Sequence, residues 1–189
     1  MYAMWVSLCR SRDPFKLVPG VPVGHKDKND NQNSKWTKAK IRRDILYADN
    51  QTLKPEALDF LCKEGPDTLI NCFSINFREW DKETHQWKDN TSMEKQRKFR
   101  DKFYQRCSHS YERPCMVDRG IQIILNSTTW EKESHEEPYK AIVRELGLDE
   151  KDGSKLGMII NTCMHPWLKS HKTFLRMSVI VRNELYNAY

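Results

Sequence analysis

Two polar residues near a predicted strand end are the candidates for contact with a ligand. Asn161 interrupts the apolar run 158–160, and His165 stands immediately before Pro166 and Trp167. A strand end beside a proline commonly borders a cleft, and an imidazole there can exchange a proton near neutral pH. We therefore predict that Asn161 and His165 lie on the rim of a substrate pocket. The simpler alternatives are a surface histidine packed on Trp167 and an asparagine on the solvent face of its strand.

Other chemically active residue types are present without a recognisable spacing. The six histidines form no pair suited to a metal, and the six cysteines include no Cys-x-x-Cys motif. The segment 153–157 resembles a phosphate-binding turn, but no predicted strand precedes it and no predicted helix follows it, so we interpret it as a connector. We therefore assign no catalytic residue, no cofactor-binding residue and no metal ligand to this chain. Its cysteines are expected to be reduced thiols within the fold.

The composition narrows the classes of protein. The 189 residues carry a formal net charge of +6, with 38% hydrophobic and 31% charged residues, which is typical of a soluble globular protein. No apolar run could span a membrane and the first nine residues lack the features of a signal peptide, so we expect a cytoplasmic protein without a membrane partner. Basic and acidic residues are interleaved between Glu94 and Lys102, which favours a solvated helix face over a nucleic-acid surface.

Three apolar runs predict strands, at 69–77, 121–125 and 156–164. The first alternates, so that one set of side chains is expected to face the core: Leu69, Phe73, Ile75 and Phe77. The other set is expected to point away from it: Cys72, Ser74 and Asn76. Residues 81–90 are expected to form a polar turn.

Helices are predicted near 37–48, from Pro55, from Thr91, from Ser134 and over 174–186. Two of them begin with a capping box, Thr91 with Glu94 and Ser134 with Glu137. Their expected buried positions are Leu58, Leu61 and Cys62 in the second helix, Phe99, Phe103 and Cys107 in the third, and Tyr139, Ile142, Val143 and Leu146 in the fourth. Gly65 and Gly147 are expected to end the second and fourth helices. The fold class is α+β, with a small sheet of about three or four strands covered by helices.

The N-terminal segment is expected to lie outside that core. Met4, Trp5 and Leu8 have the spacing of a buried helix face without a cap residue before them, and the prolines between 14 and 24 are expected to exclude regular structure. We therefore divide the chain at residue 35, with an N-terminal helix and extended loop at 1–35 that links to a missing large domain, and the α+β domain at 36–189. The three apolar residues should form an exposed patch that a partner covers.

The run from Ile70 to Arg78 resembles a strand in the C-terminal region of group II pyridoxal-phosphate-dependent amino-acid decarboxylases, especially tyrosine-decarboxylase-like proteins. It matches the pattern Ile-Asn-x-Phe-x-x-Asn-Phe-Arg at every specified position. Four other stretches are similar to segments of that family and follow the same order: 14–19, 125–130, 139–148 and 160–167.

The resemblance implies the small domain of a fold-type I pyridoxal-phosphate enzyme, a lyase of amino-acid metabolism that works as a homodimer. In that family the cofactor sits on a lysine that follows a histidine, with an aspartate on the pyridine nitrogen, and both precede the matched region. The cofactor of the parent enzyme is thus pyridoxal phosphate, which supplies the electron sink for decarboxylation, but this chain alone lacks the cofactor lysine and is not expected to bind it or to catalyse. The implied partners are an upstream large domain or a second protomer, and the amino-acid substrate of the parent enzyme.

Two other classes of protein stay open. One is a stand-alone α+β binding module that keeps the fold without catalysis. The other is a basic nucleic-acid-binding domain in which the six tryptophans would stack on bases. We do not favour the latter because no recognised motif accompanies the charge and because tryptophans beside element ends more often close a core.

Overall fold

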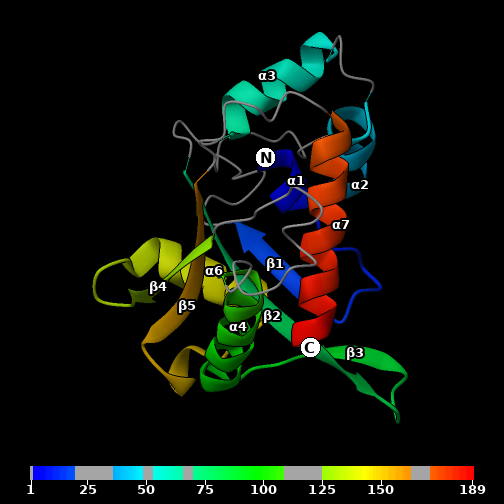
Figure 1. Cartoon of the computed structure of the whole chain (residues 1–189). Coiled ribbons are helices and arrows are strands. Elements are labelled where there is room, and N and C mark those ends of the chain that lie inside the picture. The colour runs from blue at the N-terminus through cyan, green and yellow to red at the C-terminus, as the bar shows by residue number, and fades with distance from the viewer. Residues whose placement is uncertain (1, 20–35, 49–52, 66–69, 109–124, 163–170) are drawn as a thin grey trace.

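An antiparallel sheet covered by helices on both faces forms the centre of the computed structural model, which describes residues 2–19, 36–48, 53–65, 70–108, 125–162 and 171–189 (Figure 1). The strands are β1 (Phe15–Pro19), β2 (Ile70–Asp81), β3 (Gln86–Asp89), β4 (Leu125–Glu131) and β5 (Lys155–Thr162). Four of them lie in the order β1-β2-β5-β4, and β3 pairs with the far end of β2. The described residues confirm the α+β class, with five strands where three or four were expected.

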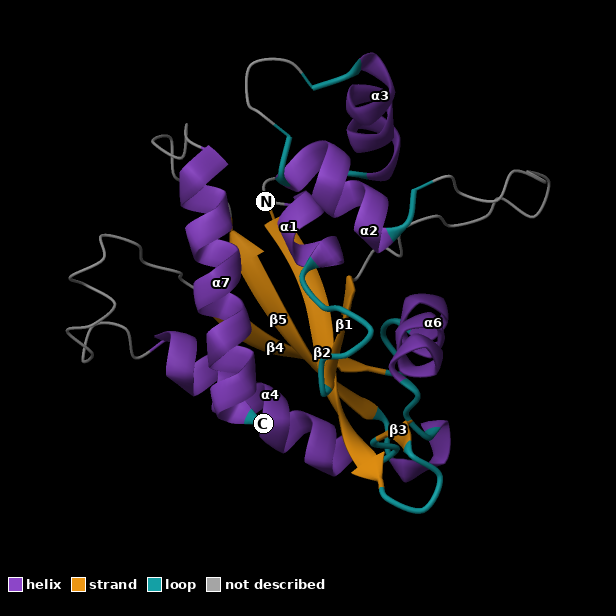
Figure 2. Ribbon diagram, turned by 90° about the vertical axis from the view of Figure 1, so that its right-hand side faces the viewer, coloured by secondary structure: helices purple, strands orange, loops and turns teal. Residues whose placement is uncertain are grey.

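The helices are distributed over the two faces of this sheet. Along the chain they are α1 (Tyr2–Ser7), α2 (Lys38–Ile41), the π-helical turn η1 (Arg42–Leu46), α3 (Pro55–Glu64), α4 (Met93–Ser108), α6 (Glu136–Leu146), the short 3-10 turn η3 (Glu150–Asp152) and α7 (His171–Ala188). Figure 2 shows α4 and α7 on one side of the sheet and α6 on the other, with α1, α2 and α3 grouped at one end. None of the described helices is both long and apolar enough to cross a membrane.

Each face of the sheet has its own buried cluster. The larger cluster joins Trp5 of α1, Phe73 of β2 and Phe103 of α4 with the apolar side of α7. On the opposite face, Val18, Leu156 and Met158 of the sheet meet α6, whose predicted stripe is completely buried: Tyr139, Ile142, Val143 and Leu146. The stripe of α4 is confirmed as well, with Phe99, Phe103 and Cys107 all buried.

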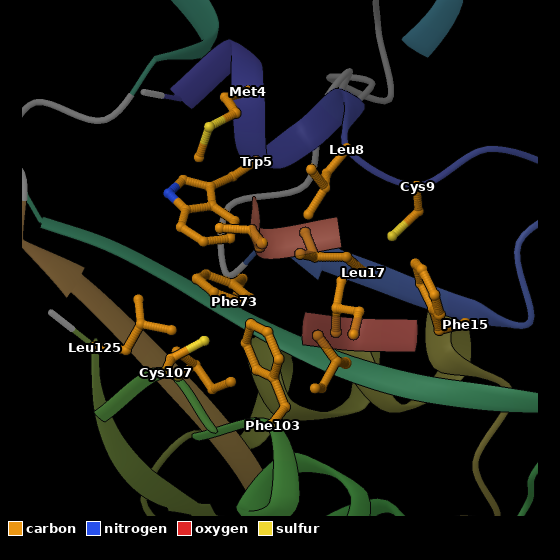
Figure 3. Close-up of a cluster of buried hydrophobic side chains, with 14 of the residues drawn as sticks. Met4, Trp5, Leu8, Cys9, Phe15, Leu17, Phe73, Phe103, Cys107 and Leu125 are labelled. Atoms are coloured by element: carbon orange, nitrogen blue, oxygen red, sulfur yellow. The ribbon is translucent and has the colours of Figure 1, made fainter. Parts of the chain in front are cut away.

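The N-terminal segment belongs to this core, contrary to the expectation of an exposed patch. Met4 is 0% exposed, Trp5 1% and Leu8 5%, all covered by described residues of the same chain (Figure 3). The prolines do not exclude regular structure either, because Phe15–Pro19 pairs with β2 in the register Phe15↔Phe77 to Pro19↔Phe73. A proline at the end of an edge strand is tolerated because its missing N–H leaves no ladder bond unmade. Residues 2–19 and the elements from 36 onward therefore share one core.

The inward side of β2 was predicted only in part. Phe73 and Ile75 are buried as expected, and Phe77 is half-buried against the larger cluster, whereas Leu69 lies outside the described residues. The expectation that Ser74 and Asn76 point away from the core is wrong, because both are completely buried. Alternation separates the two faces of a strand correctly, but here α6 covers the second face as well.

Several element boundaries differ from the predicted ones. Of the residues expected to form a polar turn at 81–90, 82–85 do form a turn, but it closes a hairpin in which Trp80 pairs with Trp87. Strand β4 runs from Leu125 to Glu131, and 121–124 lie outside the described residues. In α3 the buried residues are Ala57 and Phe60. Of the predicted stripe, Leu61 is half-buried against their cluster, whereas Leu58 and Cys62 are exposed, so the prediction is wrong for those two.

At the helix ends, the two predicted glycine stops are confirmed and the two predicted capping boxes are wrong. Gly147 ends α6 in the left-handed conformation with φ 77°, and Gly65 follows α3 as expected. Neither capping box forms as predicted. The cap hydroxyl of α4 is that of Ser92, which accepts from the N–H of Lys95 at 3.4 Å, and the residue that precedes α6 is His135, without a side-chain cap bond.

Candidate functional site

Asn161 lies near the end of β5, beneath α1. It is 3% exposed, and its Oδ1 accepts a hydrogen bond from the indole N–H of Trp5 at 3.0 Å. The alternative of an asparagine on the solvent face is therefore wrong. His165, its predicted neighbour on the rim, lies outside the described residues, so the described structure does not bring the two residues together.

The surroundings of Asn161 hold the indole in place. Trp5 stacks on Phe73 with ring centroids 4.4 Å apart and planes 25° apart, and Figure 3 shows the indole reaching from α1 down over Phe73. Asn161 stands opposite Asn71 in the β2–β5 pair and opposite Leu125 in the β4–β5 pair. A buried indole N–H needs an acceptor, and Asn161 supplies one at the edge of an apolar cluster.

A second buried polar group, which the sequence did not indicate, is the carboxamide of Gln96. The ladder between β2 and β5 stops at Phe73↔Ile159. Beyond that point the Gln96 amide donates to the carbonyl of Ile75 at 2.9 Å and to that of Gly157 at 3.0 Å, while its oxygen accepts from the Gly157 N–H at 3.2 Å. The side chain thus replaces the missing rungs between the two strands, because buried backbone groups require partners.

Gly157 provides the room for that contact. A Cβ at this position would lie 3.0 Å from Nε of Arg100 and 3.1 Å from Oε1 of Gln96, which is closer than ordinary packing allows. A glutamine three residues before the buried Phe99 of a helix, together with a glycine inside a predicted strand, is the signal that could have revealed this contact.

Two asparagines, Asn76 of β2 and Asn90 just after β3, link the sheet to the end of α6. The Asn76 amide donates to the carbonyls of Asn90 and Leu146 at 2.7 and 3.0 Å, and the Asn90 amide donates back to Oδ1 of Asn76 at 3.0 Å. All donors of these two amides are used within the fold, because Asn90 also donates to the carbonyl of Ser92. The pair braces the hairpin and the end of α6, and it leaves no polar group directed at a ligand.

One buried carboxylate ties the start of the chain to α7. Asp13 is 1% exposed, and it accepts from Arg182, from the hydroxyl of Tyr186 at 2.8 Å and from the N–H of Arg10 at 2.8 Å. Burial alone would raise the pKa of Asp13, but the hydrogen bond from Arg182 and those from Arg10 and Tyr186 outweigh it and hold the pKa below its ordinary value. Asp13 is therefore a charged anchor rather than a proton donor.

Two of the described thiols, Cys9 and Cys72, are unsuited to act as nucleophiles. Burial raises the pKa of Cys9 to about 12 and that of Cys72 to about 11, so neither forms a thiolate near neutral pH. Cys9, Cys62, Cys72 and Cys107 are free, and Cys115 and Cys163 lie outside the described residues. Cys62 is exposed instead of buried.

A metal site requires several suitable side chains close together among the described residues. No group of three or more His, Cys, Asp or Glu that could hold a metal occurs among them. An imine-forming lysine would need a free amine near a carboxylate for the ring nitrogen and donors for the phosphate. Three of the described lysines that line pockets already have partners: Lys16 pairs with Asp89, Lys98 with Glu94, and Lys102 donates to the Ala188 carbonyl.

The chain matches no model of a known protein family, and a search of curated proteins finds no similar sequence.

Proposed function

We propose that this chain is the C-terminal small-domain part of a pyridoxal-phosphate-dependent amino-acid decarboxylase, a carboxy-lyase, and that it is not catalytic alone. The cofactor, its lysine and the pyridine-binding aspartate would belong to a large domain upstream, and the parent enzyme would work as a cytoplasmic homodimer on an amino acid. The described residues of this chain would support the pocket without taking part in proton transfer.

One observation carries the proposal. The stretches that resemble the decarboxylase family are the elements that pair with each other: 14–19 overlaps β1, 70–78 lies in β2, 125–130 in β4, 139–148 covers most of α6 and the turn after it, and 160–162 ends β5. Short resemblances that arise by chance have no reason to fall on every strand of one four-stranded path. These stretches also contact one another, because Phe15 opposes Phe77 in the strand register and the Asn76 amide donates to the backbone carbonyl of Leu146.

The role that we propose for these residues is to hold neighbouring segments of the chain in place. Arg78, the last residue of the matched run, donates to the carbonyls of Ser11 at 3.1 Å and of Asp13, and so fixes the chain that enters β1. Asn161 fixes α1 through Trp5, close to the point where the chain continues to His165. In a parent enzyme such contacts would hold the rim residues of the pocket at a constant position relative to the sheet.

A second candidate is a binding module of the same fold without catalysis. The burial of Met4, Trp5 and Leu8 favours it, because a domain that needed a partner at α1 would leave that face open. The two candidates differ in what the polypeptide carries upstream of Met1.

The experiment is to sequence the full-length transcript that encodes this chain and to read the protein sequence upstream. The decarboxylase proposal expects a histidine-lysine pair, preceded by an aspartate, in a large domain that continues in frame into Met1. A transcript with an in-frame stop codon shortly before Met1 would overturn it in favour of the binding module.

A further inference from the structure

A groove of about 500 Å³ lies where the outer side of α4 meets β2 and the end of α7. Figure 1 shows the C-terminal end of α7 close to both elements. Three lysines and three aromatic rings dominate its lining: Lys95, Lys98, Lys102, Phe77, Phe99 and Tyr189. This volume is in the range of sites that hold a small organic molecule.

The lysines share one side of α4, because positions i, i+3 and i+7 of a helix lie above one another. Lys98 makes an ion pair with Glu94 at 2.5 Å, but both side chains are more than half exposed, so the pair is weak and exchangeable. Lys102 donates to the carbonyl of Ala188 at 3.0 Å, which holds its ammonium at the end of α7. Among the described residues Lys95 makes no ion pair. Glu79 is the one acidic residue in the lining, so the groove has an excess of positive charge.

The aromatic rings form an apolar wall beside these ammonium groups. Phe77 meets Phe99 edge-on at 5.6 Å between centroids and Tyr189 at 6.4 Å. Phe99 is buried beneath the wall, Phe77 is half-buried and Tyr189 is 50% exposed. An apolar wall next to a row of cations is complementary to a molecule with an apolar ring and an anionic group.

We propose that this groove binds a small amphipathic anion, with its aromatic body on Phe77 and Tyr189 and its carboxylate or sulfonate held by Lys95, Lys98 and Lys102. A lysine row alone is usually a solvated helix face; the hollow and the ring wall are what distinguish this one. The site is separate from Asn161, and it does not rest on the decarboxylase proposal.

The test is calorimetric titration of the chain with three isosteric probes: 2-naphthoate, neutral 2-naphthamide and cationic 2-naphthylmethylammonium. Naphthoate should bind at one site, at least roughly tenfold more tightly than naphthamide, and its affinity should fall as salt rises because exposed charges are screened. The cationic probe should not bind.

The double variant Lys95→Gln, Lys98→Gln should weaken naphthoate binding by roughly tenfold, and Tyr189→Ala should weaken both naphthoate and naphthamide. The matched control is Lys63→Gln on α3, which removes a similarly exposed lysine from a similar i,i+4 pair with Asp59 and should leave binding unchanged. Unfolding midpoints show that each variant is folded. Equal affinity for naphthoate and naphthamide, unchanged binding by the lysine variant, or tighter binding of an acidic peptide than of naphthoate would overturn the proposal.

Discussion

The indole N–H of Trp5 donates to Oδ1 of Asn161 over 3.0 Å and so joins two residues that are 156 positions apart in the chain. Both side chains are buried, and the bond holds α1 on the end of β5. Because the indole N–H is buried, the loss of its acceptor would leave a donor without a partner. That loss should cost more stability than the loss of an exposed hydrogen bond.

We expect Asn161→Ala to lower the free energy of unfolding by about 1–3 kcal/mol, the cost of a buried donor left without its acceptor. Urea unfolding followed by tryptophan fluorescence measures it. The control is Asn126→Ala in the neighbouring strand β4, an exposed asparagine whose loss should cost little. Equal effects of the two substitutions would contradict the role given to Asn161.

The close approach of α4 to β5 predicts a second effect. Gly157→Ala places a methyl group 3.0 Å from Arg100 and 3.1 Å from Gln96, and overpacking of this kind typically costs about 1–3 kcal/mol. Gly153→Ala is the control, since a Cβ there meets only Sδ of Met93, at 3.7 Å. If the two alanine variants unfold at the same denaturant concentration, the Gln96 contact does not constrain the strand.

The anchor at Asp13 predicts a dependence on pH. Its folded-state pKa is held below the ordinary value of 3.8, so its contribution to stability is present above pH 3.8 and is lost as the pH falls through the folded pKa. Unfolding experiments on the chain and on Asp13→Asn should give a large difference in stability at pH 7 that shrinks below pH 3.8. The exposed Asp59→Asn should show almost no difference at either pH. If the difference in stability between the chain and Asp13→Asn grows as the pH falls, the role given to the Asp13 carboxylate is wrong.

Thiol reactivity gives a further, independent check of the core. Exposed Cys62 should react with iodoacetamide in the native chain, whereas Cys9, with its pKa raised to about 12 by burial, should react only after unfolding. Peptide mass spectrometry after a short exposure distinguishes the sites. Labelling of Cys9 at the rate of Cys62 would mean that Cys9 is not buried as described.

The sequence predicted those parts of the fold that depend on a regular apolar period. The stripes of α4 and α6 were recognised because every third or fourth residue is apolar, and Gly147 because only glycine readily adopts a left-handed helix end. The hairpin at Trp80 and Trp87 was missed because its turn lacks Asn-Gly or Asp-Gly. His85 takes the left-handed conformation there with φ 50°, and Asp81 accepts from the N–H groups of Glu83 and Thr84.

The buried polar residues could not be predicted, because their partners are distant in sequence. Ser74 and Asn76 alternate with apolar residues as solvent-facing side chains would. Only the contacts of Ser74 with Gln96 of α4 and of Asn76 with the end of α6 reveal that both are covered. The same holds for Trp5, whose acceptor lies at the other end of the chain. Of the predicted rim, Asn161 has a structural partner and its role toward a substrate stays a prediction, as does that of His165.

The most direct measurement of the central claim is borohydride trapping of the native protein. Protein isolated with an antibody against this chain is reduced and its peptides are mapped by mass spectrometry, beside the isolated 189-residue chain incubated with pyridoxal phosphate. The decarboxylase account predicts a phosphopyridoxyl-lysine after a histidine, upstream of Met1 in a longer polypeptide, and no specific adduct in the isolated chain. A native protein without any pyridoxyl-lysine, or an isolated chain trapped at one of its own lysines, would contradict it.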